Sequence, residues 1–269
     1  MTLSDTTIAF EAFGARIAVR TAESVPSDLQ PRLPPRARPI ISEDYDVVYA
    51  VERISPRSSS NHAEYQLTRG GLAVGPSGSL SHVRGELESD MHFQVALFAR
   101  NFLFVHAGVV QWNGRAVVIP GRTETGKSSL VMALINAGGV YFSDEYAVLD
   151  PEGRVHAYPK ALSERREEGP PRLHSAKALG GQEEAPAVPI GLTVITRFRD
   201  GAAWNPQPVT KAQAMIALFD NTVVARVKPE FALAVLAKAV AGTEGLEGDR
   251  GEASEMASGL LQAVRSPGT

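Results

Sequence analysis

The residues with the clearest chemical meaning lie near the middle of the 269-residue chain. Gly121 to Ser128 satisfies the pattern G-x-x-x-x-G-K-[ST], in which a glycine-bounded loop leads to a lysine and a hydroxyl residue. Backbone N–H groups of such a loop bind phosphate oxygens, the lysine adds a point charge, and the hydroxyl can ligate Mg²⁺. The expected phosphate site comprises Gly121, Arg122, Thr123, Glu124, Thr125, Gly126, Lys127, Ser128 and Ser129.

The flanking sequence predicts the elements that position this loop. A β-branched run from Ala116 to Ile119 comes directly before it and predicts a strand. Ser129 to Ala137 follows with the pattern of a helix, and Gly138-Gly139 gives that helix a stop signal. An ordinary glycine-bounded turn before a helix is the simpler alternative. The order strand, loop, helix favours the phosphate site.

Two adjacent acids, Asp144 and Glu145, interrupt the next apolar run, Val140 to Leu149. We expect this run to form one strand that pairs alongside the strand feeding the loop, so that the acids face the phosphates. Two carboxylates beside a nucleotide and Mg²⁺ can divide the work: one accepts the proton of an attacking hydroxyl, and the other holds the metal. The alternative is a solvent-exposed charge pair at a strand end.

His106 lies upstream, in the strand-like run from Phe102 to Val110. Asn113-Gly114 is a strong two-residue hairpin signal, and it predicts that this strand folds back along the one that feeds the loop. His106 would then approach the acids and orient or proton-couple one of them. A lone histidine in an apolar strand also fits a purely structural role, and the sequence leaves both roles open.

In their order and spacing, His106-Ala107-Gly108, the loop and Asp144-Glu145 resemble the catalytic domain of HPr kinase/phosphorylase and of HPr-kinase-related proteins. Tyr158 to Leu162 is similar to the Pro-containing segment of that family, and the likeness covers roughly residues 95–240. The resemblance implies an α/β fold with a P-loop core like that of HPr kinase and phosphoenolpyruvate carboxykinase, preceded here by a β-rich N-terminal region.

The resemblance also implies an ATP- and Mg²⁺-dependent kinase acting on a hydroxyl, most directly a serine of a protein or peptide. Lys127 and Ser128 would bind phosphates and Mg²⁺. Asp144 would act as the base, assisted by His106, and Glu145 would support the metal.

The chain differs from the family pattern at three points. Thr123-Glu124 stands where Ser-Gly is usual, Glu145 stands where a second aspartate is usual, and the Glu-x-Arg-Gly segment is missing. Two other functions therefore stay open: an ATP-binding module without phosphotransfer, and a carboxykinase-like enzyme that phosphorylates a small molecule.

The composition narrows the chemistry. Without cysteine there is no disulfide, thiolate nucleophile, Cys-zinc site or iron–sulfur cluster. A formal charge of −3 argues against nucleic acid and anionic lipid as partners. No apolar run nears the ~20 residues of a membrane span, and the N-terminus lacks the pattern of a signal peptide. We expect a soluble cytoplasmic protein, and the sequence leaves self-association open.

We divide the chain into a β-rich region of unknown role at residues 1–95, a catalytic domain at 96–242 and a loose tail at 243–269. The tail is predicted to be loose because residues 242–254 carry four glycines and five charged residues. The other predicted elements are a helix from Glu86 to Phe102 and a mobile polar loop from Arg165 to Pro189. Three more helices are predicted: Thr210 to Phe219, with Thr210 and Gln213 in capping-box spacing, Pro229 to Ala241, and a weak last helix from Glu255 to Val264.

Overall fold

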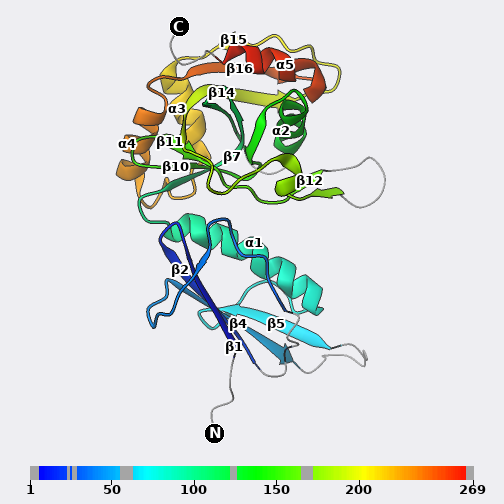
Figure 1. Ribbon diagram of the computed structural model, residues 1–269, viewed down its shortest axis with the longest axis vertical. Helices are drawn as coiled ribbons and strands as arrows, with labels where there is room; N and C mark the ends of the chain where they lie inside the picture. The colour runs from blue at the N-terminus through cyan, green and yellow to red at the C-terminus, as the bar shows by residue number, and fades with distance from the viewer. Residues whose placement is uncertain are drawn as a thin grey trace. The chain divides into compact units, whose positions relative to one another are not determined.

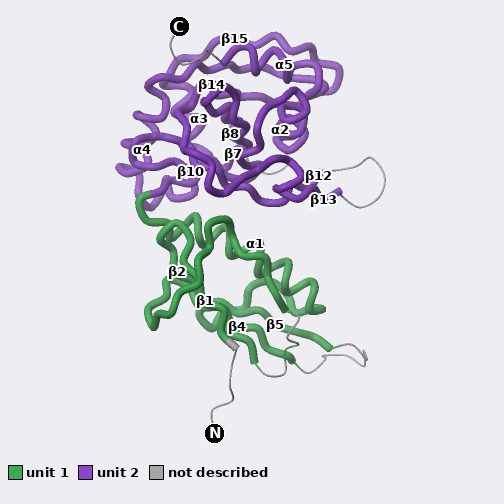
Figure 2. Tube along the Cα trace, viewed as in Figure 1, with its two compact units in different colours: residues 1–101 green, residues 102–269 purple. Residues whose placement is uncertain are grey.

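The computed structural model describes residues 6–22, 25, 29–54, 63–121, 126–164 and 172–264. The chain divides into two compact units, residues 1–101 and 102–269 (Figure 2). Each unit combines helix and sheet, and the described ranges contain five α-helices. Within these ranges, no helix is both long and apolar enough to cross a membrane.

The first unit is a six-stranded sheet with one helix. Its strands run in the order β3-β1-β2-β4-β5-β6; only β2 and β4 pair in parallel. The helix α1 packs against β2 and β5 (Figure 1). The elements are β1 (Thr6–Ala12), β2 (Ala15–Thr21), β3 (Arg38–Pro39), β4 (Val47–Ile54), β5 (Glu64–Arg69), β6 (Leu72–Ala73) and α1 (Leu80–Phe98).

The helix α1 begins and ends earlier than its apolar spacing predicts. Ser79 caps it, because its side chain accepts the N–H of His82 at 3.3 Å. The helix ends at Phe98, and Asn101 has a positive φ of 61°, which a helix does not accommodate. Its buried face carries the residues that gave the predicted period, among them Leu87 and Met91.

The second unit is built on an eight-stranded sheet. Its main order is β11-β10-β7-β8-β14-β16-β15; β9 also pairs with β7, and β11 with β14. Its elements are β7 (Leu103–Trp112), β8 (Arg115–Pro120), α2 (Lys127–Asn136), β9 (Val140–Ser143), β10 (Tyr146–Leu149), β11 (Arg154–His156), β12 (Leu162–Glu164), β13 (Arg172–His174), η1 (Lys177–Leu179), β14 (Val188–Phe198), β15 (Gln207–Pro208), α3 (Lys211–Asp220), α4 (Pro229–Ala239), β16 (Glu244–Arg250) and α5 (Ala253–Ala263).

The predicted hairpin at Asn113-Gly114 is confirmed. Both turn residues have positive φ, 48° and 73°, and β7 and β8 pair antiparallel so that Ala107 lies opposite Pro120. β8 is in turn parallel to β14, and β14 is parallel to β16. The carboxyl ends of β8, β14 and β16 therefore lie at one edge of the sheet, where the loop after β8 begins.

The strand with the two acids differs from its prediction in two ways. It is split into β9 and β10, and both pair antiparallel with β7 rather than alongside β8. The split has a local cause: the Ser143 hydroxyl accepts the N–H groups of Glu145 and Tyr146 at 3.1 and 3.0 Å, which turns the backbone. Because β8 and β9 both run opposite to β7, the acids still follow β9 at the edge where the loop starts.

The prediction of a loose C-terminal segment is wrong for residues 244–250, which form β16, whereas the last helix predicted from Glu255 to Val264 is confirmed as α5 (Ala253–Ala263). β16 pairs with seven residues of β14, and α5 packs against α2 with Met256 and Leu260 in the core. The glycines that suggested looseness permit close packing instead. A Cβ at Gly245 would lie 2.4 Å from a Val209 methyl. Only glycine therefore lets the segment just before α3, which contains Val209, lie this close to β16.

The helices of this unit lie on both sides of its sheet. α2 and α5 share one core with β7, β8 and β14, whereas α3 and α4 lie on the other side of these strands (Figure 1). The capping box predicted at Thr210 and Gln213 is confirmed, and Pro229 begins α4. The polar segment predicted as a loop contains β13 and η1, and its residues 165–171 lie outside the described residues.

Candidate phosphate-binding site

The predicted phosphate loop is described at its two ends. At its start, the N–H of Gly121 donates to the carbonyl of His106 at 3.1 Å, which ties the end of β8 to β7. At its other end, Gly126 caps α2 with a φ of +80° and has no side chain to cover the helix N-terminus. The predicted site residues Arg122, Thr123, Glu124 and Thr125 lie outside the described residues.

Lys127 and Ser128 occupy the first turn of α2, which begins at Lys127 rather than at Ser129. Burial lowers the pKa of Lys127, and the charges of Asp144 and Glu145 partly oppose this effect. Ser129, the third predicted residue of this turn, is exposed. The positive end of the helix dipole and a half-buried lysine therefore lie together at this terminus.

Asp144 lies against this turn. The Ser128 hydroxyl lies within hydrogen-bonding reach of its carboxylate, so two residues that the sequence assigned to one site lie together. Burial raises the pKa of Asp144, and the hydrogen bond from Ser128 opposes the rise. A buried carboxylate with a raised pKa is stabilised by any cation that binds beside it.

Glu145 points to a different partner. Its side chain forms an ion pair with Lys160, and both side chains keep about a third of their surface or less in solvent, at 26% and 36%. Its backbone carbonyl accepts the N–H of Ala107 at 3.1 Å, and the carbonyl of Lys160 accepts the buried Tyr141 hydroxyl at 2.7 Å. The backbone around both charges is thus tied to β7 and β9.

His106 lies on β7, which pairs on one side with β8, the strand before the loop, and on the other with β10, the strand after the acids. Its carbonyl binds Gly121, as described above, and its N–H donates to the carbonyl of Asn221 at 2.8 Å. Its ring lies 4.8 Å from the ring of Tyr146, its cross-strand neighbour. By the alternation of a strand, His106 faces the same side as Gly108, which packs under α2. Assistance from His106 to an acid stays a prediction.

Two further cations lie beside this site: Lys160, which the sequence offered only as a candidate basic residue for a carboxykinase-like enzyme, and Arg250, to which it gave no role. Lys160 lies in the Pro-containing segment on which the resemblance partly rests, but the sequence did not predict its ion pair with Glu145. Arg250 ends β16, in the stretch predicted to be loose, and its Nη2 donates to the carbonyl of Gly126 at 2.8 Å. No local signal marks Arg250, because only the pairing of β14 with β16 brings it to the loop.

The donors at this edge fit a magnesium ion. In the described part of the chain, no three His, Asp or Glu side chains gather as a metal cage. Mg²⁺ at a nucleotide site needs no such cage, since it is held by one or two carboxylates together with phosphate oxygens and water. Asp144 and the Ser128 hydroxyl supply two neighbouring oxygen donors, and Asp144 is a half-buried carboxylate that a cation would stabilise.

No protein-family model matches the chain, and no curated protein matches its sequence. The likeness to HPr kinase therefore rests on the residues and spacings themselves.

Proposed function

We propose that this protein is an ATP-dependent kinase that transfers the γ-phosphate to a hydroxyl group, with a serine of a protein or peptide as the expected acceptor. The proposal is carried by one observation: the first turn of α2 places the Ser128 hydroxyl within hydrogen-bonding reach of Asp144 and the charge of Lys127 beside it. A glycine-bounded turn that merely starts a helix would not require a half-buried carboxylate beside it.

Phosphate binding falls to the helix terminus. The N–H groups at the start of α2 have no side-chain cap, and Lys127 adds its charge at this terminus. Since transferred phosphoryl groups carry charge on their equatorial oxygens, preorganised donors of this kind lower the barrier to transfer.

The contacts favour a division of labour between the acids that is the reverse of the one the resemblance implies. Asp144 touches the Ser128 hydroxyl, so these two residues would hold Mg²⁺, which when bound neutralises phosphate charge. Glu145 pairs instead with Lys160 and is partly open to solvent. We therefore assign Glu145 as the base that accepts the proton of the acceptor hydroxyl, with Lys160 holding its carboxylate in place.

The direct test is phosphate transfer from labelled ATP. The protein is incubated with Mg²⁺, γ-labelled ATP and the protein or peptide products of neighbouring genes, and phosphoserine is sought in the products. The expected result is acceptor labelling that the variant Lys127→Ala lacks. Equal labelling by that variant contradicts the proposal, and ATP binding without transfer to any hydroxyl leaves a nucleotide-binding module.

A further inference from the structure

Arg250 is a buried cation at the edge of the phosphate site. It is the last residue of β16, and only 2% of its surface is exposed. Nη2 donates to the carbonyl of Gly126 at 2.8 Å, and Nη1 donates to the carbonyl of Gly251 at 2.9 Å. The guanidinium carbon also lies 5.5 Å from the centre of the Phe198 ring. These contacts fix the guanidinium group against the start of α2.

Among the residues that the structure describes, no carboxylate pairs with Arg250. Its hydrogen-bond acceptors are neutral carbonyls, and in the described part of the chain it forms no ion pair, while its Nε has no hydrogen-bond partner. Burial lowers the pKa of Arg250, and the nearby charge of Glu252 only partly opposes this. A buried, unpaired cation is costly in the free protein, and the cost falls when an anion binds nearby.

The contact between Arg250 and the Gly126 carbonyl requires glycine at position 126. Gly126 has a φ of +80°, and a Cβ there would lie 2.3 Å from Nη2 of Arg250. The lack of a side chain lets the guanidinium group reach the carbonyl that also accepts the N–H of Leu130 in the first turn of α2. Arg250 thus links β16 to Gly126, the residue that caps the N-terminus of α2.

We propose that Arg250 is a positioning residue for the phosphate site: it holds the Gly126 carbonyl in place, and its unmatched charge favours binding of a polyphosphate at the start of α2. The inference rests on the proposed phosphate site but not on phosphate transfer. It makes the C-terminal strand part of the nucleotide site, whereas the sequence motif ends at Ser128.

The test measures binding of ADP and of inorganic pyrophosphate to the full chain by calorimetry, together with the melting temperature with and without each ligand. Arg250→Gln removes the charge, and Arg250→Lys keeps the charge but cannot reach both carbonyls. The matched control is Arg199→Gln, because Arg199 is exposed and already paired with Asp249 at 3.2 Å.

We expect Arg250→Gln to weaken binding of both ligands about 10- to 100-fold, as the loss of a charged hydrogen bond does. Arg250→Lys should fall between this variant and the parent, and Arg199→Gln should stay within about twofold of the parent. Without ligand, Arg250→Gln should melt at or above the parent's temperature, because the unpaired charge is gone. A purely structural arginine would give the opposite, a lower melting temperature.

Three results would overturn the inference. One is parental affinity in Arg250→Gln with a lowered melting temperature. Another, should Arg250→Gln not fold, is parental affinity in Arg250→Lys. The third is a parent chain that binds neither ADP nor pyrophosphate, which removes the proposed function as well.

Discussion

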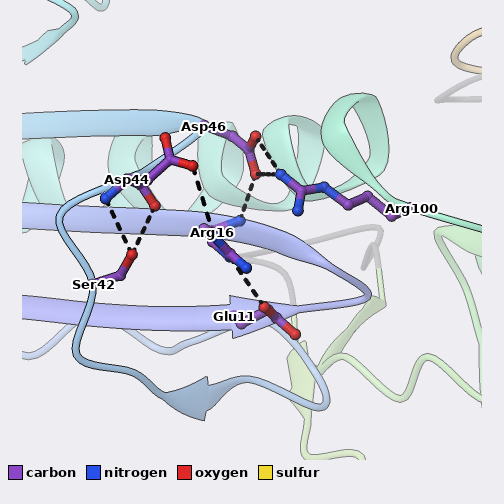
Figure 3. Close-up of polar contacts among 6 residues, drawn as sticks. All are labelled: Glu11, Arg16, Ser42, Asp44, Asp46 and Arg100. Atoms are coloured by element: carbon purple, nitrogen blue, oxygen red, sulfur yellow. Dashed lines mark hydrogen bonds and ion pairs between the residues drawn. The ribbon is translucent and has the colours of Figure 1, made fainter.

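Charged side chains cluster in both units, but they are satisfied in different ways. In the first unit, Arg16 pairs with Glu11 and Asp44, and Arg100 pairs with Asp46 at 3.0 Å (Figure 3). In the second unit, Arg250 is almost fully buried and bonds only to carbonyl oxygens. In the first unit the charges are paired with one another, whereas Arg250 has no carboxylate partner among the described residues.

The first-unit cluster of Arg16, Arg100 and their carboxylate partners has a structural role. Asp46 accepts the backbone N–H of Arg16 at 2.8 Å as well as the Arg100 guanidinium group, and the N–H of Arg100 donates to the carbonyl of Phe13 at 2.9 Å. These bonds fix the β1–β2 turn, the start of β4 and the end of the unit to one another. The comparison indicates that unmatched charge, rather than the number of charges, distinguishes a candidate binding site from a structural network.

The largest effect should come from removing Lys127 at the candidate phosphate site. Lys127→Ala is expected to reduce phosphate transfer about 10³-fold or more, the range seen when a phosphate-contacting cation is lost. The measurement is the rate of transfer from labelled ATP at saturating Mg²⁺. Lys177→Ala, at an exposed position in η1, is the control and should keep the parental rate. A parental rate in Lys127→Ala would show that the site is not catalytic.

The two acids should separate binding from transfer. Glu145→Gln is expected to keep nucleotide affinity and to slow transfer about 10²-fold or more, because a general base is lost. Asp144→Asn is expected to weaken Mg²⁺-dependent nucleotide binding at least about 10-fold. Titration of Mg²⁺ against a fluorescent ADP analogue measures the second effect. The reverse pattern would restore the division that the resemblance implies, with Asp144 as the base.

Gly126→Ala should cost less but should affect both stability and binding. The positive φ and the close contact with Arg250 predict a loss of roughly 1–3 kcal/mol in the free energy of unfolding, with weaker ADP binding. Gly114→Ala is the matched control, because Gly114 also has a positive φ, 73°, but has no atom within 4 Å of an added Cβ. If both variants lose equal stability and neither loses ADP affinity, Gly126 serves only the turn.

The smallest effect should come from a substitution in the first-unit cluster around Asp46. Asp46→Asn removes a charge from a partly exposed network and is expected to lower the free energy of unfolding by about 0.5–1 kcal/mol, less at high salt because exposed ion pairs are screened. Urea unfolding at low and high NaCl measures this. ADP affinity should stay at the parental value, and a change in it would show that the first unit influences the phosphate site.

Local signals predicted much of the fold. The Asn113-Gly114 turn, the capping box at Thr210 and the proline that begins α4 all act within a few residues, so their effects are readable from the sequence. The strand pairing of the acids was not readable in this way. Whether β9 lies beside β7 or beside β8 depends on contacts between segments distant along the chain, which no local pattern encodes.

The sequence by itself determined the chemistry of the candidate site: a glycine-bounded loop, a lysine and a hydroxyl on the following helix, and two acids after the next strand. Only the tertiary structure decided how these groups are shared, because side-chain partners depend on distance in space. It set Asp144 against Ser128 and Glu145 against Lys160, and it brought Arg250 to Gly126 from a strand whose glycines had suggested a loose tail. Burial then changed the meaning of these charges, since an unpaired cation is harmless in water and costly inside a protein.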